Sequence, residues 1–153
     1  MIAQAGMNND RLGNLIRGVA TEMLEDQTGF WRFQIEDALV FVVTDESHNR
    51  MRIMTPVAEL AQISEEECQV LLGANFDRAL DARYCSNDGV VWSAFLHPLR
   101  ELKDQQFLDA LDQVVRLSKN FGTTYTSSDL IFCLLYTSPS PRDATLSRMP
   151  SSA

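Results

Sequence analysis

The side chains best suited to chemistry in this sequence are its two histidines and three cysteines. Hydrolytic catalysis needs a histidine held beside a nucleophile and an acid. His97 could meet Asp77, Asp81 or Cys85 if the strands around it pair, whereas His48 lies in a polar turn. No nucleophile elbow, CxxC, HExxH, P-loop or GxGxxG motif accompanies them. We therefore expect no catalytic residue and no enzyme, and keep a small hydrolase using His97 as an alternative.

Three consecutive glutamates follow Ser64 and could form a carboxylate site for a metal ion. The same stretch fits a capping box, in which the Ser64 hydroxyl accepts from the Glu67 amide and the Glu67 carboxylate accepts from the Ser64 amide. Because a helix start explains these residues, we expect no metal and no cofactor. Cys68, Cys85 and Cys133 have no close partner in the sequence, which predicts free thiols in a reducing cytoplasm.

Aromatic and branched apolar side chains gather in the predicted strands, where core packing accounts for most of them. If helices cover only one face of the sheet, Val40, Val42, Met54 and Phe95 would place apolar surface on the other face. Exposed apolar surface of that kind marks an interface. A bound peptide or a second copy of the chain could cover it. The candidate peptide-binding residues are Trp31, Phe33, Val40, Val42 and Phe95.

Periodicity predicts the elements that position these residues. Apolar residues recur at helical spacing over residues 9–26, 65–74 and 104–121, and strand patterns cover 30–35, 38–44, 50–55, 80–85 and 90–97. The run 38–44 is apolar on both sides, which predicts a strand covered on both faces. The order α-β-β-β-α-β-β-α indicates an α+β domain, an antiparallel sheet with helices packed on one face.

Composition narrows the class of protein. The chain is 45% hydrophobic and 22% charged, as ordinary soluble globular proteins are. Its formal net charge of −8 argues against a nucleic-acid partner, which would need a basic face. The longest apolar run, 38–43, is far shorter than the roughly 20 residues of a membrane helix, so no membrane partner is expected.

The character of the sequence changes near residue 133. The segment 133–153 holds three of the five prolines and several serines, without periodicity. Such composition favours disorder. The segment also resembles the translated read-through of a sequencing adapter. We therefore expect a flexible N-terminus over 1–8, a domain over 9–132, and a disordered tail foreign to the natural protein over 133–153.

A family resemblance is carried by segments 50–56, 71–84, 92–99, 113–115 and 120–125. These segments resemble bacterial YbjN-type proteins, which belong with the CesT-like chaperones to the type III secretion chaperone-like superfamily. The resemblance extends over about residues 12–127. It implies a small, acidic, cytoplasmic α+β protein, often a homodimer, that binds peptide segments of other proteins without ATP.

The leading hypothesis is therefore a non-enzymatic peptide-binding chaperone or regulatory adaptor of bacterial type, with a protein or peptide client. A client segment would add along a sheet edge or lie in apolar grooves beside the first helix. The main alternative is an oligomeric regulatory protein without clients.

Overall fold

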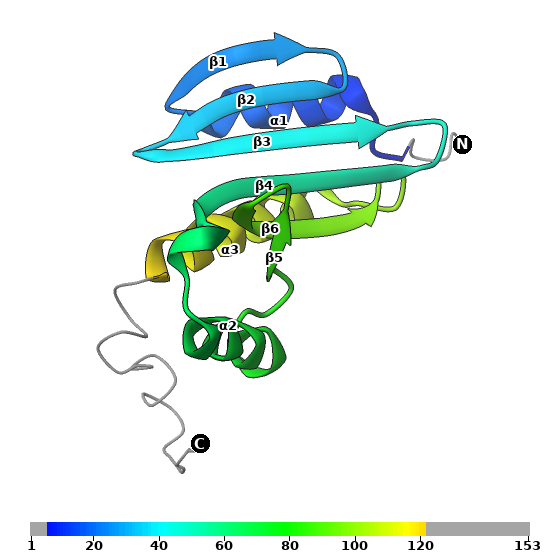
Figure 1. Cartoon of the computed structure of the whole chain (residues 1–153). Helices are drawn as coiled ribbons and strands as arrows, with labels where there is room; N and C mark the ends of the chain where they lie inside the picture. Colours follow the sequence, from blue (N-terminus) through cyan, green and yellow to red (C-terminus); the bar gives the residue numbers. More distant parts are fainter. Residues whose placement is uncertain (1–5, 122–153) are drawn as a thin grey trace.

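The computed structural model describes residues 6–121 and shows one antiparallel sheet of six strands with three α-helices (Figure 1). The elements are α1 (Asn9–Val19), β1 (Glu22–Gln27), β2 (Phe30–Ile35), β3 (Ala38–Asp45), β4 (Arg50–Glu59), the 3₁₀ helix η1 (Leu60–Gln62), α2 (Glu65–Asp77), β5 (Arg83–Asn87), β6 (Val90–Pro98) and α3 (Asp104–Asn120). The strands lie in the order β1-β2-β3-β4-β6-β5. This arrangement confirms the predicted α+β class. The expected domain end at residue 132, the tail and Cys133 lie outside the described residues.

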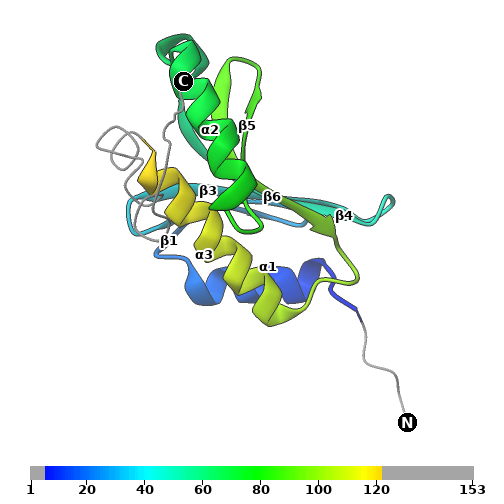
Figure 2. The ribbon, with the colours of Figure 1, turned by 90° about the horizontal axis from the view of Figure 1, so that it is seen from below.

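Two helices form the layer that covers the sheet. Figure 2 shows α1 and α3 together on one side of the strands, with α2 apart from this pair and beside β5. The core lies between the sheet and the pair α1 and α3, where Leu12, Ile16, Phe107 and Val114 are inaccessible to solvent. The predicted inner stripe of α3 is confirmed in its central part, and Ser93 donates from the sheet to the Val114 carbonyl at 2.8 Å.

The N-terminal helix is shorter than its periodicity predicts, and a strand follows it. Helix α1 begins after Asn8, whose side chain accepts from the Arg11 amide, and it ends at Val19. Gly18 and the β-branched residues near it have low helix propensity. An apolar residue at position 23 suits both conformations. It would continue the apolar stripe of a longer helix, and in the structure Met23 of β1 pairs with Phe33 of β2. The periodicity therefore could not separate the helix from β1.

Around α2 the predicted helix start is confirmed and the predicted helix end is not. Ser64 and Glu67 form the capping box, with bonds of 3.1 and 2.9 Å. The helix continues to Asp77, past the predicted end at residue 74. Leu80 then adopts a positive φ of 59° in a turn, so the next strand begins at Arg83 instead of residue 80.

The hairpin between β5 and β6 turns at Asp88-Gly89, a residue pair typical of tight reversals. Asp88 and Gly89 both have positive φ, at 54° and 81°. Two successive positive φ values give the turn whose twist matches that of antiparallel strands. Tyr84 of β5 donates its hydroxyl hydrogen to the Leu117 carbonyl at 2.7 Å, which fixes α3 over this hairpin.

Candidate functional site: the open face and edges of the sheet

All of the predicted peptide-binding residues lie in the core. At most 6% of their surface is exposed: Trp31, Phe33, Val40, Val42 and Phe95. The predicted position of Val40, Val42 and Phe95 on the uncovered face is therefore wrong. Contact with a peptide stays a prediction for all five residues, but their side chains would first have to be uncovered.

The strand register explains this outcome. Phe33 pairs with Val40, and Trp31 pairs with Val42, so all four side chains point to the same side of the sheet. Strand β3 is apolar on both sides, so its sequence pattern cannot show which side the helices cover. No second layer within the described part of the chain closes the other side, and its residues Leu39, Phe41 and Val43 are partly exposed.

The uncovered side, which we call the open face, consists of the outward side chains of β2, β3, β4 and β6. Its apolar members include Phe30, Leu39, Phe41, Val43, Met54, Pro56, Trp92 and Leu96. The ring centroids of Phe30 and Phe41 are 6.3 Å apart, and Phe41 meets Trp92 edge-on at 5.8 Å. Of the residues expected on this face, only Met54 lies there. The alternation in β6 was a usable signal, since Trp92 and Leu96 share a side.

Trp92 carries an unsatisfied polar atom on this face. Its indole Nε1 is shielded from solvent and has no hydrogen-bond partner among residues 6–121. A buried donor without an acceptor costs about 1–3 kcal/mol. An acceptor brought by a bound molecule would offset this cost if the ring turned toward it.

Arginines on β4 adjoin the apolar part of the open face. Arg50 and Arg52 are exposed, and neither forms an ion pair within the described part of the chain. They line a pocket of about 210 Å³ whose apolar walls include Val43 and Leu96. Arg32, on β2, is instead paired with Glu25 at 2.9 Å.

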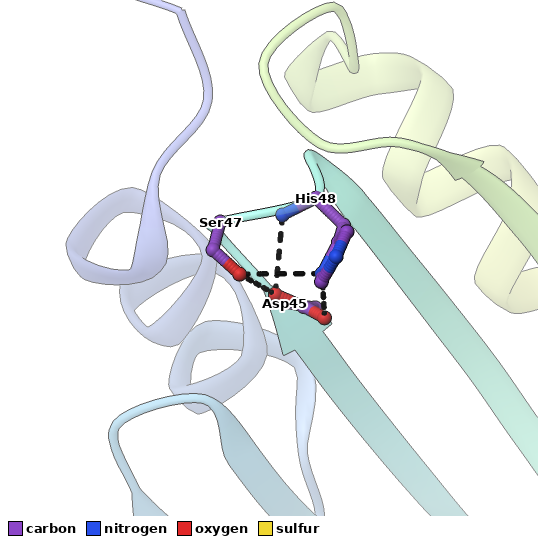
Figure 3. Close-up of polar contacts among 3 residues, drawn as sticks. All are labelled: Asp45, Ser47 and His48. Carbon is purple, nitrogen blue, oxygen red and sulfur yellow. Dashed lines mark hydrogen bonds and ion pairs between the residues drawn. The ribbon is translucent and has the colours of Figure 1, made fainter.

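The β3–β4 turn holds a serine, a histidine and an aspartate in contact (Figure 3). Hydrogen bonds from Ser47, and then from the His48 side chain and amide, lower the pKa of Asp45 to about 2. Ser47 Oγ and Asp45 Oδ2 both approach the same ring nitrogen of His48, Nδ1, at 3.2 and 2.8 Å. A catalytic triad instead needs the serine and the acid on opposite ring nitrogens. The group is an exposed turn cap.

His97 does not make the contacts that the hydrolase alternative requires. Its Nδ1 lies 2.8 Å from the Pro98 carbonyl and must donate to it, so Nε2 accepts from the Gln106 amide group at 3.3 Å. The ring stacks on Phe95. Within the described residues it contacts none of the expected partners. Asp77 pairs with Arg78 at 2.6 Å, Gln113 accepts from the Asp81 amide, and Cys85 lies on β5.

Cys68 and Cys85 are free thiols that line one pocket of about 240 Å³ between α2 and β5. Burial raises the pKa of the Cys85 thiol, and the charge of Arg52 opposes this only in part. A raised pKa leaves little thiolate at neutral pH and makes a poor nucleophile. Within residues 6–121, no three His, Cys, Asp or Glu side chains cluster in a way that could hold a metal ion. The same residues contain no helix with the length and apolar character needed to span a membrane.

The two edges of the sheet differ. On β5 the Asn75 side chain donates to the Tyr84 carbonyl at 3.0 Å and accepts from the Tyr84 amide at 2.8 Å. A side-chain amide thus takes the place of a neighbouring strand. The outer edge of β1 has no such partner among the described backbone groups. Strand β1 is therefore the edge at which another strand could add.

Helix α2 and the turn that follows it expose three large apolar side chains that sequence reasoning missed. Leu72, Phe76 and Leu80 are 67%, 91% and 70% exposed. The spacing of four residues was the available signal. It was obscured because the predicted helix ended at residue 74 and residue 80 was assigned to a strand.

Comparison with known proteins identifies structures of the same fold but no related sequence. No sequence-family profile matches the chain. No curated protein sequence matches it. Solved structures do match. A chain of the HopA1–SchA chaperone–effector complex is 13% identical with a TM-score of 0.55, and the match covers 72% of this chain and 88% of that chain. A chain of the ExsC–ExsE complex is 14% identical with a TM-score of 0.56, and the match covers 74% of this chain and 92% of that chain. A third is the Yersinia pestis type III secretion chaperone SycH with a fragment of YscM2, which is 13% identical with a TM-score of 0.55, and the match covers 74% of this chain and 98% of that chain. At such low identity the likeness shows the fold alone, and it confirms the predicted chaperone-like fold.

Proposed function

We propose that this chain is a non-enzymatic peptide-binding protein, a YbjN-type chaperone or regulatory adaptor that works without ATP in the bacterial cytoplasm. The observation that carries the proposal is the open face, where Phe41 and Trp92 form an aromatic cluster that none of the helices within residues 6–121 covers. The fold of the chain supports it, since structures of the same fold contain a chaperone with an effector or with a protein fragment.

The free edge of β1 supplies a second way to hold a peptide. An extended segment that pairs with Glu22–Gln27 would continue the sheet, and its backbone hydrogen bonds would give affinity independent of sequence. Apolar contacts with the adjoining face would add selectivity. Because the Asn75 side chain already bonds the outward amide and carbonyl of Tyr84 on β5, we expect strand addition at β1.

Tryptophan fluorescence tests the proposal on the full chain. The chain has two tryptophans, of which Trp31 is buried beneath the helices and Trp92 lies on the open face. Peptides are selected from a displayed library against the full chain. We expect them to shift the emission of Trp92 to the blue in Trp31→Phe, and to leave the emission of Trp31 unchanged in Trp92→Phe. A selection that enriches no sequence, or peptides that change only Trp31, would contradict the proposal.

Amide hydrogen exchange tests the edge separately. Peptide binding should slow exchange in Glu22–Gln27 and leave Arg83–Asn87 unchanged. Equal protection of both strands would show that the peptide does not add at β1.

We further propose that α2 mediates a homodimer. In a two-fold contact the same surface serves both copies, so Phe76 of one copy can meet the pocket beside Leu72 of the other. Sedimentation velocity should show a dimer that Phe76→Glu dissociates. Val19→Glu introduces the same charge on α1 and should leave the dimer intact. A monomeric wild-type chain, or equal effects of both variants, would exclude this contact.

The same experiments decide between an adaptor and an oligomeric regulator without clients. The exposed apolar side chains of α2 and its following turn favour self-association, and the regulator remains the second candidate for that reason. A dimer in which Trp92 becomes buried and no peptide binds would favour the regulator. A dimer that leaves Trp92 accessible to peptides favours the adaptor.

A further inference from the structure

Strand β4 carries two exposed arginines without a carboxylate partner in the described residues, in a chain whose formal net charge is −8. Arg11, Arg17, Arg32, Arg78 and Arg116 each lie within 3 Å of a carboxylate oxygen. Arg50, Arg52, Arg83 and Arg100 form no such pair in residues 6–121. The Arg83 guanidinium donates instead to the Leu80 and Ala82 carbonyls, whereas Arg50 and Arg52 lie side by side on the open face. The nearby Asp45 is already bonded to Ser47 and His48. Two guanidinium groups therefore remain available at the edge of an apolar surface.

The outward row of β4 changes character along the strand. Arg50 and Arg52 come first, and Met54 and Pro56 follow on the same side. Successive members of such a row are about 6.6 Å apart, because side chains alternate along a strand. Val43 of β3 and Leu96 of β6 flank the arginines in the pocket of about 210 Å³. The row is therefore basic in its first half and apolar in its second half.

We propose that this row binds an acidic, apolar peptide segment of another protein in extended conformation. Carboxylates two residues apart in the segment would face Arg50 and Arg52, and the next two alternate side chains would be apolar and lie over Met54 and Pro56. The segment pattern is thus acidic-x-acidic-x-apolar-x-apolar, in either chain direction. The inference rests on the proposed function, because it names the class of peptide that the open face selects.

A second copy of this chain does not supply such a segment from its described strands. A bulge between Met23 and Glu25 places Glu22 and Glu25 of β1 on the same side, followed there by the polar Gln27, and β3 ends its outward row with Asp45 alone. The glutamates before Cys68 belong to helix α2, where side chains do not alternate. The charge pattern therefore points to a different protein as the source of the segment.

Matched synthetic peptides test the inference on the full Trp31→Phe chain, with Trp92 emission as the readout. One peptide carries the acidic pattern, one carries it in reverse order, and a control replaces Asp by Asn. We expect at least one acidic peptide to bind about tenfold more tightly than the Asn peptide, as two charged pairs at a partly exposed site imply. The double variant Arg50→Gln/Arg52→Gln should abolish the difference. The double variant Arg100→Gln/Arg116→Gln removes the same charge elsewhere and should keep it.

Each other outcome overturns the inference. Equal binding of acidic and Asn peptides would remove the acidic preference and leave the proposed function standing. If both double variants lost the preference for the acidic peptide equally, the net charge of the chain would explain that preference, and Arg50 and Arg52 would have no specific role. If the arginine variant instead dissociates a dimer and no pattern peptide binds, the row is an interface between copies. If no pattern peptide binds at about 1 mM, the inference fails, and the library selection decides the proposed function independently.

Discussion

Replacing Asn75 should both destabilise the fold and open a second sheet edge. The Asn75 side chain makes two hydrogen bonds with the backbone of Tyr84, at 3.0 and 2.8 Å. The net contribution of each hydrogen bond to stability is about 1 kcal/mol. Because Asn75 is half-buried, water can replace part of the lost hydrogen bonding when its side chain is removed. We therefore expect Asn75→Ala to lower the free energy of unfolding by about 1–2 kcal/mol, or the melting temperature by about 3–6 °C.

Urea titration followed by tryptophan fluorescence measures the loss, and two variants separate its causes. Asn75→Asp keeps an acceptor for the Tyr84 amide but places a carboxylate against the Tyr84 carbonyl, so it should be at least as destabilising. Gln69→Ala, at an exposed position on the same helix, should change stability by less than about 0.5 kcal/mol. If Asn75→Ala matched Gln69→Ala, the amide would not be acting as a strand substitute.

The edge itself has a second readout. With Asn75→Ala, peptide binding should slow amide exchange in β5 as well as in β1, because the Tyr84 backbone groups become available for pairing. Unchanged exchange in β5 would mean that α2 blocks this edge without the amide.

Three further predictions follow from single contacts. Tyr84→Phe removes the buried hydrogen bond to Leu117 and should cost about 1–1.5 kcal/mol in urea unfolding; no measurable loss would contradict the bond. Phe33→Ala should cost about 3–5 kcal/mol, because the ring is inaccessible beneath the helices; a loss below about 1 kcal/mol would place the ring outside the core. Hydrogen bonding lowers the pKa of Asp45 to about 2, so its stabilising contribution is present above the unfolded pKa of about 3.9 and is lost as pH falls toward 2; an NMR titration midpoint near 3.9 would show that the turn cap does not form.

Local chemistry made part of the fold predictable. The Ser64 capping box and the Asp88-Gly89 turn each depend on residues that are neighbours in sequence, and both are present. The apolar stripe of α3 repeats over several turns, which fixes its inner face without knowledge of the rest. Strand β1 was missed because Met23 suits a helix and a strand equally well, and only pairing with Phe33 decides between them.

The site was harder to predict than the fold, because exposure depends on which layer covers which face. Val40 and Phe41 are neighbours on β3, and both are apolar. Val40 is buried and Phe41 is partly exposed only because α1 and α3 cover the side of the sheet to which Val40 points. Phe76 illustrates the same limit on α2: its spacing from Leu72 was visible, but its exposure follows from the place of α2 outside the helical layer. The unpaired state of Arg52 likewise appears only when the neighbouring strands are assembled.

The two proposed binding features of the sheet place a lower limit on the length of any client that uses both. Neighbouring strands lie about 4.8 Å apart, so a strand added outside β1 would be about 19 Å from β4. An extended chain spans about 3.3 Å per residue, and about six residues are needed to connect the two segments. One continuous short strand therefore cannot occupy the β1 edge and the β4 row together. A client with both segments and a sufficient linker would gain from effective concentration, whereas a client with a shorter linker would bind no better than its stronger segment alone.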